Sequence, residues 1–141
     1  MHIALKLDPT PAEVDGILLK LVRSNWQVAQ TQQSFQPFML SLTDAVSGES
    51  VGGLVGMAEW DWLQVQYVFV PEALRRQGHG RALMDRAEAF ARERSLSGIW
   101  LDSFGFQPLD FFTALGFDLV GSIEGNPVGS RRNFLSRRLD R

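Results

Sequence analysis

The sequence predicts an α/β protein in which a mixed β-sheet carries helices on both faces. Two observations support this fold class, and the length of the chain indicates the number of domains. Three segments carry apolar residues at helical spacing, whereas the segments between them alternate or form short runs of β-forming residues. Several strands follow one another before the central helical pattern, so antiparallel and parallel pairings should mix. The 141 residues suit one core of ordinary size, so we expect a single domain over residues 1–141.

The first third of the chain predicts a strand and then a helix. Residues 2–7 alternate weakly, as in a strand. Thr10 and Glu13 then form a capping-box pattern, with Pro11 at the first helical position. Apolar residues continue at helical spacing to about Ser24, and the polar stretch 27–36 is either a loop or a short second helix.

The rest of the chain predicts strands interrupted by two helices. Turn-forming residues separate the β-rich runs, and Gly116 is placed as the cap of a short helix. The expected strands cover residues 38–43, 50–60, 63–70, 99–103, 117–123 and 133–139, and the expected helices cover 81–94 and 109–115.

Composition narrows the classes of function. With no cysteine, the chain has no disulfide, thiolate nucleophile or cysteine metal site. No apolar run approaches the roughly 18 residues of a membrane span, and no basic stretch precedes an apolar leader, so we expect a cytoplasmic protein that does not engage membranes. The net charge of -2 argues against general nucleic-acid binding.

Basic residues are nonetheless unevenly placed. Only Lys6 and Lys20 are lysines among the 14 basic residues, and the arginines form two groups. The group at the end of the chain, within residues 131–141, is interpreted as the solvated face of an edge strand protected from aggregation. The group within residues 75–81 lies beside two glycines and is interpreted as an anion site.

The most informative segment is the strand, loop and helix start from Val68 to Arg81. An apolar strand ends at Pro71, a basic loop follows, and Gly78 and Gly80 open directly into a helical pattern. A helix N-terminus presents N–H groups without intrahelical partners, and glycines leave them accessible. Arg81 opposes the helix dipole unless an anion is bound there. The segment therefore predicts binding of a pyrophosphate.

Other interpretations of the two glycines stay open on their spacing alone. They are also compatible with a simple tight connection between a strand and a helix. A Walker loop would continue with lysine and a hydroxyl residue, but Arg81 and Ala82 follow Gly80. A dinucleotide fingerprint would need a third glycine where Leu83 stands, and would come early in a run of βαβ units.

Three stretches together resemble the GCN5-related N-acetyltransferase (GNAT) family. Arg75-x-x-Gly78-x-Gly80 after Val70-Pro71 resembles its acetyl-CoA motif. Residues 101–117 (LDSFGFQPLDFFTALGF) are similar to a branch that reads roughly LDTFSFQAxxFYxxLGF, and residues 127–139 are similar to that branch's PxGxxRxFLxxxL ending. The resemblance runs from about Gly52 to the end. It implies a GNAT-like acyl-CoA N-acyltransferase fold with a mixed sheet of about six to seven strands.

The resemblance implies acetyl-CoA as co-substrate, with no metal. In the family, the strand before the loop separates from its neighbour and pairs with the pantetheine arm, a role that falls on Val68, Phe69 and Val70. The remaining expected cofactor-binding residues are Arg75, Arg76, Gln77, Gly78, His79, Gly80 and Arg81 around the pyrophosphate, together with Gln107 and Phe112.

The implied reaction is direct attack of a neutral amine on the thioester, so a base or a water chain must take a proton. The candidate catalytic residues are Asp102, Glu59 and Tyr67. Asp102 lies in an otherwise apolar strand, where a structural hydrogen bond is an equal alternative, and Glu59 flanks a turn, where a solvated acid is the alternative. Tyr67 is the one tyrosine of the chain, on the strand that lines the expected cleft.

Two positions depart from the family pattern. The tyrosine that usually protonates the departing sulfur corresponds to Phe112, which has no proton to donate. The acidic position that the family often has before the loop falls near Gln64 and Gln66, which are neutral. Either the thiolate leaves unaided or another group assists it.

Three functions follow as hypotheses. The first is an N-acetyltransferase that transfers the acetyl group of acetyl-CoA to a primary amine of a small molecule. The second is a non-catalytic acyl-CoA-binding or regulatory protein on the same fold, and the third is a module that binds a phosphorylated partner. Trp60 and Trp62 either line an acceptor site for a flat or cationic molecule or belong to the core. A homodimer is compatible with the sequence.

Overall fold

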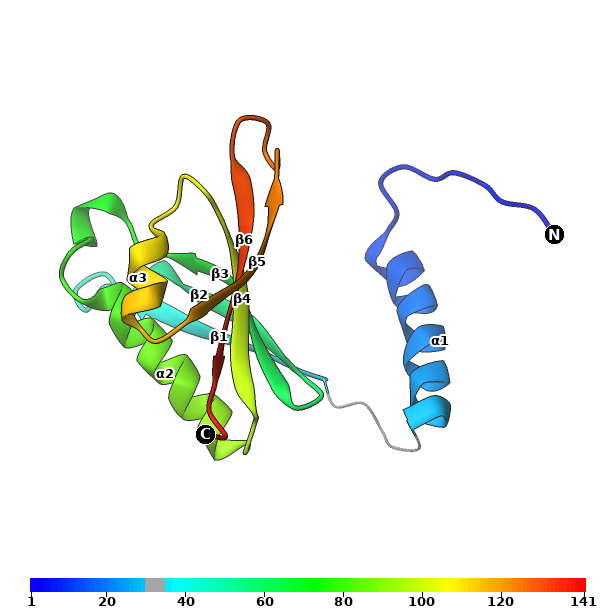
Figure 1. Ribbon diagram of the computed structural model, residues 1–141, viewed down its shortest axis with the longest axis horizontal. Helices are drawn as coiled ribbons and strands as arrows, with labels where there is room; N and C mark the ends of the chain where they lie inside the picture. Colours follow the sequence, from blue (N-terminus) through cyan, green and yellow to red (C-terminus); the bar gives the residue numbers. More distant parts are fainter. Residues whose placement is uncertain (30–34) are drawn as a thin grey trace. The chain divides into compact units, whose positions relative to one another are not determined.

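The computed structural model describes residues 1–29 and 35–141. The chain divides into two compact units, Met1–Ser34 and Phe35–Arg141. The first contains helix α1 (Pro11–Ala29), and the second contains the sheet (Figure 1). The single domain expected over residues 1–141 stays a prediction. No helix in the described ranges is long and apolar enough to cross a membrane.

Helix α1 begins at the predicted capping box. Thr10 Oγ1 accepts a hydrogen bond from the Glu13 N–H at 3.2 Å, and Glu13 Oε1 accepts one from the Thr10 N–H at 3.0 Å. Pro11 takes the first helical position, where no N–H is needed. The helix continues to Ala29, beyond the predicted end near Ser24. Of the stretch 27–36, residues 30–34 lie outside the described residues.

The strand predicted over residues 2–7 is wrong. Residues 1–10 contain neither helix nor strand, and Ile3 and Leu5 are exposed. A strand is stable only when its backbone groups pair with a neighbour, and the described part of this unit contains no other strand. A weak alternation of apolar residues is therefore insufficient to make one here.

The second unit is built on a six-stranded mixed sheet with the order β1-β2-β3-β4-β6-β5. Neighbouring strands are antiparallel except β3 and β4, which are parallel. The strands are β1 (Phe35–Thr43), β2 (Ser50–Glu59), β3 (Trp62–Phe69), β4 (Gly98–Phe104), β5 (Asp118–Glu124) and β6 (Arg131–Arg138). The predicted mixed sheet is confirmed.

Helices α2 (His79–Glu93) and α3 (Leu109–Ala114) pack against one buried core of the second unit, and a short helix, η1 (Glu72–Leu74), precedes α2. The side chains that α2 buries recur at helical spacing, as expected for a helix with one apolar face. Leu54, Leu63, Ile99, Leu101 and Leu135 are the largest fully buried side chains of the sheet. The second helix-covered face expected from the sequence would require α1, and it stays a prediction.

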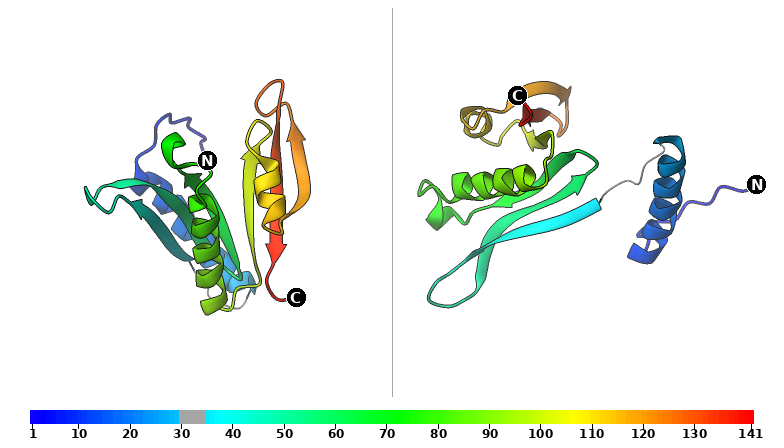
Figure 2. Two further views of the ribbon diagram at one scale, coloured as in Figure 1. Left: turned by 90° about the vertical axis from the view of Figure 1, so that its left-hand side faces the viewer. Right: turned by 90° about the horizontal axis from the view of Figure 1, so that it is seen from below.

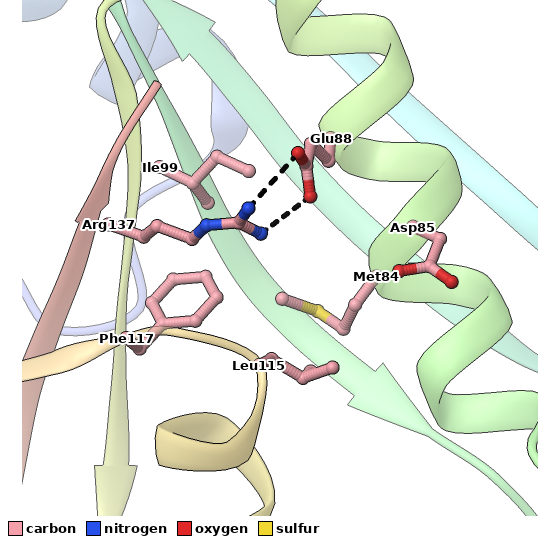
Figure 3. A pocket seen from close by; sticks show the side chains of 7 residues that line it. All are labelled: Met84, Asp85, Glu88, Ile99, Leu115, Phe117 and Arg137. Atoms are coloured by element: carbon pink, nitrogen blue, oxygen red, sulfur yellow. Dashed lines mark hydrogen bonds and ion pairs between the residues drawn. The ribbon is translucent and has the colours of Figure 1, made fainter. Parts of the chain in front are cut away.

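A charged clamp joins α2 to β6. Arg137 donates from Nη1 to Glu88 Oε2 at 2.6 Å and from Nη2 to Glu88 Oε1 at 3.3 Å, while Arg92 Nε donates to Glu88 Oε1 at 3.0 Å. Figure 3 shows the Glu88–Arg137 pair beside Met84 and Ile99. Partial burial by itself would raise the pKa of Glu88, but the Arg92 hydrogen bond and the Arg137 charge outweigh it and hold the pKa below its ordinary value.

The interpretation of the last strand as a solvated edge is wrong. β6 lies between β4 and β5, so β5 forms that end of the sheet. Its arginines find acidic partners: Arg132 pairs with Asp102, and Arg137 pairs with Glu88. A run of arginines in sequence thus becomes a set of ion pairs, because alternate residues of the strand point to opposite faces. The homodimer stays a prediction.

Replacing Glu88 with glutamine should lower the free energy of unfolding at pH 7 by about 1–2 kcal/mol, since Arg137 loses its charged partner. The native pKa of Glu88 is lowered from its ordinary value of 4.5, so its contribution to stability is complete above that pH and disappears as the pH falls through the native pKa. Urea unfolding at several pH values should show a shallower acid loss in Glu88→Gln.

The matched control is Glu93→Gln, which removes an exposed charge from the same helix and should change little. Identical acid profiles for Glu88→Gln and the wild-type chain would contradict the assignment of the clamp.

Candidate functional site

The parallel pairing of β3 and β4 stops half-way along β3. The strands pair from Trp62–Gly98 to Val65–Leu101, and beyond this point no pairing joins them in the described sheet. β3 stays paired with β2 as far as Phe69, and β4 stays paired with β6 as far as Phe104. Figure 2 (left) shows the two groups of strands diverging. The facing edges of β3 and β4 are therefore open, as the resemblance implies.

An irregularity in β3 coincides with the separation. Val55 of β2 pairs with Tyr67, but its neighbour Gly56 pairs with Val65, so Gln66 is an extra residue in β3. A bulge reverses the alternation of side chains along a strand. Val65 is buried, whereas Tyr67 is 71% exposed and Val68 packs against the core instead. The bulge therefore places the tyrosine on the face opposite α2.

The loop after β3 folds back into the start of α2. The Leu74 N–H bonds to Pro71 O and the Arg75 N–H to Glu72 O, which completes η1. Arg76 then has a φ of 62° and Gly78 a φ of 85°. A positive φ is uncommon for arginine and marks local strain of the kind found at functional sites.

Every backbone N–H from Arg76 to Arg81 lacks a hydrogen-bond partner among the described residues. The next N–H groups on either side are bonded, that of Arg75 to Glu72 O and that of Ala82 to Gly78 O. Consecutive free N–H groups at a strained turn and a helix N-terminus form a site for an anion. The pyrophosphate of acetyl-CoA fits this chemistry, because it carries acceptor oxygens and negative charge.

Gly78 and Gly80 are each required in the loop for a different structural reason. Gly78 has the left-handed φ that glycine adopts without strain, and a Cβ there would meet nothing within 4 Å. A Cβ on Gly80 would lie 3.3 Å from Phe111 Cζ, so this glycine lets α3 approach the start of α2. Access to the N–H groups is therefore a result of the turn as a whole.

The electrostatics of the loop favour an anion. The first turn of α2 contains no acidic residue, and Arg81 stands there with a 4.0 Å contact to Asp85. Arg75 Nε donates to Val70 O at 2.9 Å, which ties the loop to the end of β3. Arg76 is exposed. Positive charge at a helix N-terminus is unfavourable unless an anion compensates it.

Asp102 lies at the start of the open edge of β4. Its Oδ2 accepts a hydrogen bond from Arg132 Nε at 2.6 Å, and its side chain is 18% exposed. The Arg132 guanidinium also lies over the Phe104 ring, 5.4 Å from its centroid. Arg132 is a partner that the sequence reasoning did not assign, since only the register of β4 on β6 brings it beside Asp102.

The other predicted residues are spread along the sheet. Glu59 pairs with Trp62, at the end of β3 where it still contacts β4, about 10 Å along the strand from Val65. Tyr67 flanks the open edge. Glu59 and Tyr67 are therefore not brought together.

Gln107 and Phe112 have structural contacts. Gln107 Oε1 accepts a hydrogen bond from the Phe104 N–H at 2.7 Å and so caps the end of β4. Phe112 is half-buried and packs edge-to-face against Phe111 and Phe117. Phe112 also packs against the buried core of the second unit.

Trp60 and Trp62 are half-buried at the turn between β2 and β3. The Arg138 guanidinium lies over the Trp62 ring, 5.4 Å from its centroid. This ring already has a cation of the protein itself as a partner, so a role in binding a cationic acceptor is weakened.

Comparison with known proteins agrees with this geometry. A model of the "Acetyltransferase (GNAT) family" matches residues 11–117. The blasticidin-S acetyltransferase of Streptomyces morookaense is 38% identical over 93 residues, which cover 65% of this chain and 68% of that protein.

Solved structures resemble nearly the whole chain. A crystal structure of a proposed acetyltransferase from Agrobacterium tumefaciens has 28% identity and a TM-score of 0.88, covering 98% of this chain and 99% of that one. The crystal structure of an acetyltransferase from Bacillus cereus has 27% identity and a TM-score of 0.82, covering 99% of this chain and 100% of that one.

Replacing Arg81 with glutamate should weaken binding of coenzyme A about 10-fold, because a negative charge would face the anion at the helix N-terminus. Isothermal titration calorimetry at two salt concentrations checks this, and the loss should shrink at high salt. Arg86→Glu makes the same charge change at an exposed position further along α2 and serves as the control. Equal losses in both variants would contradict binding at the loop.

Proposed function

Because the chain belongs to the GNAT family of acetyltransferases, we propose that it transfers the acetyl group of acetyl-CoA to a primary amine of a small molecule. Family membership makes it an acetyl-CoA-dependent acyltransferase. We therefore prefer acetyl-CoA over a phosphorylated partner protein as the ligand of the loop. The observation that carries the proposal is the run of free N–H groups from Arg76 to Arg81 beside the open edge of β3.

The loop and the open edge suit the two halves of coenzyme A. The N–H groups of the loop would hold the pyrophosphate, and the Arg76 and Arg81 guanidinium groups would balance its charge. Beyond Val65 the backbone of β3 has no strand on its β4 side, so Val68 and Phe69 can pair there with the amide groups of the pantetheine arm. Arg75 would act by fixing the loop on Val70 rather than by touching the phosphates.

A small-molecule acceptor is supported by the relative from Streptomyces morookaense, whose name gives blasticidin S as its substrate. In this chain the separation of β3 from β4 would let the acetyl group reach the face opposite α2, where Tyr67 is exposed. A turnover assay with a panel of amines identifies the acceptor.

Asp102 is the base that we favour among the three candidates. It stands one residue beyond the last β3–β4 pair, whereas Glu59 of β2 pairs with Trp62 at the other end of β3. Arg132 occupies Oδ2, and Oδ1 accepts no hydrogen bond from a described residue, so a lone pair remains for the proton of the attacking amine. Tyr67 would line the acceptor side and orient the amine.

The experiment is a turnover assay in which a thiol reagent detects released coenzyme A. The chain contains no cysteine, so the protein itself adds no thiol background. We expect release that depends on the amine when acetyl-CoA is incubated with a panel of small primary amines, blasticidin S included. Mass spectrometry of the acceptor should show addition of one acetyl group.

The second candidate function is a non-catalytic acyl-CoA-binding protein, which is favoured by Phe112 because this side chain has no proton to donate. It predicts a different result. It would bind acetyl-CoA in calorimetry, and any slow hydrolysis would not respond to amines. That outcome would overturn the proposed transferase activity and leave the binding site intact.

A further inference from the structure

Ser103 carries a hydroxyl that the fold leaves without a partner. The residue is 4% exposed, and its Oγ has no hydrogen-bond partner among the described residues. Buried hydroxyl groups are nearly always satisfied, because an unmade hydrogen bond in the interior is unfavourable. An unpaired hydroxyl in the interior of the sheet is therefore a candidate to bind a group that the protein does not itself supply.

The neighbours of Ser103 do not account for it. Asn133 of β6 lies directly opposite in the register and is also buried. Its Oδ1 accepts a hydrogen bond from Ser122 Oγ at 2.8 Å, so Asn133 is engaged with β5. This bond uses Asn133 Oδ1, and among the described residues no hydrogen bond joins Ser103 Oγ to Asn133 or to Ser122.

The place of Ser103 in the sheet indicates what its partner is. Side chains alternate along β4, so Ser103 shares the helix-covered face with the buried Ile99 and Leu101. Leu101 belongs to the last β3–β4 pair. Ser103 is thus the first residue on that face after the two strands separate, and its side towards β3 has no paired strand.

The two ends of the open edge between β3 and β4 differ, and this difference indicates how acetyl-CoA would be oriented. The loop from Arg76 to Arg81, at the far end of β3, would hold the phosphates. The thioester is the opposite end of the molecule, so it would lie where β3 and β4 come together, next to Val65 and Leu101. Ser103 stands on one side of this point, and Asp102 stands on the other because consecutive residues of a strand point to opposite faces.

We propose that the Ser103 hydroxyl donates a hydrogen bond to the sulfur of acetyl-CoA as it departs, in place of the phenol that Phe112 lacks. This inference rests on the proposed acetyl transfer. Ser103 then touches the reacting atoms and is a catalytic residue for the step, without giving up its proton.

The step balances without a further reactant. The amine nitrogen forms a bond to the carbonyl carbon, the carbon–sulfur bond breaks, and its electron pair stays on sulfur. The amine proton goes to Asp102 or to solvent. A thiol with an ordinary pKa near 8.5 leaves readily as a thiolate, and a hydrogen bond from a hydroxyl lowers the free energy of that anion.

The test compares Ser103→Ala with Ser122→Ala. Because hydrogen bonds to charged groups are among the stronger ones, Ser103→Ala should lower kcat about 10- to 100-fold with KM for acetyl-CoA nearly unchanged. Its Tm should be unchanged or higher, since an unpaired buried hydroxyl is removed. Ser122→Ala should lower Tm, because Asn133 loses its partner, and leave kcat near that of the wild type. Ser103→Thr, which keeps the hydroxyl, should restore kcat.

Three results would overturn the inference: an unchanged kcat in Ser103→Ala, a fall in kcat accompanied by a lower Tm, or a rise in KM in place of the fall in kcat. Failure of the proposed function itself would show separately, as absence of amine-dependent turnover in the wild-type chain.

Discussion

The end of pairing between β3 and β4 at Val65–Leu101 is the constraint on which the rest of the site depends. A parallel pair that stops half-way leaves backbone groups of both strands without a neighbour, an arrangement that a single continuous sheet would not tolerate in its interior. The sheet is nonetheless held together, because α2 packs on the first group of strands and the Glu88–Arg137 clamp fixes it to β6 of the second group. Helix α2 therefore fixes the position of both groups of strands, and the gap between β3 and β4 stays open.

The same geometry distributes charge in a consistent way. Free N–H groups and arginines gather at the start of α2, where the helix dipole favours an anion. At the other end of the open edge, Asp102 is held by Arg132 on one face and the Ser103 hydroxyl is buried on the other. The proposed phosphate site and the proposed proton-handling residues are thus separated by the length of the open strand edge, which suits a long carrier with its reactive group at one end.

Much of this could be predicted from the sequence. The capping box at Thr10, the open loop between Pro71 and Arg81, and the order of elements from β1 onward depend on local patterns, which propensity and turn chemistry determine. The strand over residues 2–7 failed because pairing, not alternation, stabilises a strand. Residue spacing did not show the bulge at Gln66, because a bulge is defined only by its partner strand.

The contacts between side chains of neighbouring strands could not be predicted from the sequence. Nothing local indicates that β6 inserts between β4 and β5, so the partnership of Arg132 with Asp102 and the isolation of Ser103 beside Asn133 emerge only from the register. The family resemblance located the loop, and the structure added that its N–H groups are free, that Gly80 serves the packing of Phe111, and that Arg75 is an anchor.

The most direct test of the account is to follow the backbone amide resonances of the protein by NMR as acetyl-CoA is added. The N–H groups from Arg76 to Arg81 should show the largest shifts and slower hydrogen exchange in the complex, whereas those of Leu74 and Arg75, already bonded to protein carbonyls, should change less. Saturation with acetyl-CoA that leaves the Arg76–Arg81 amides unshifted and freely exchanging would contradict it.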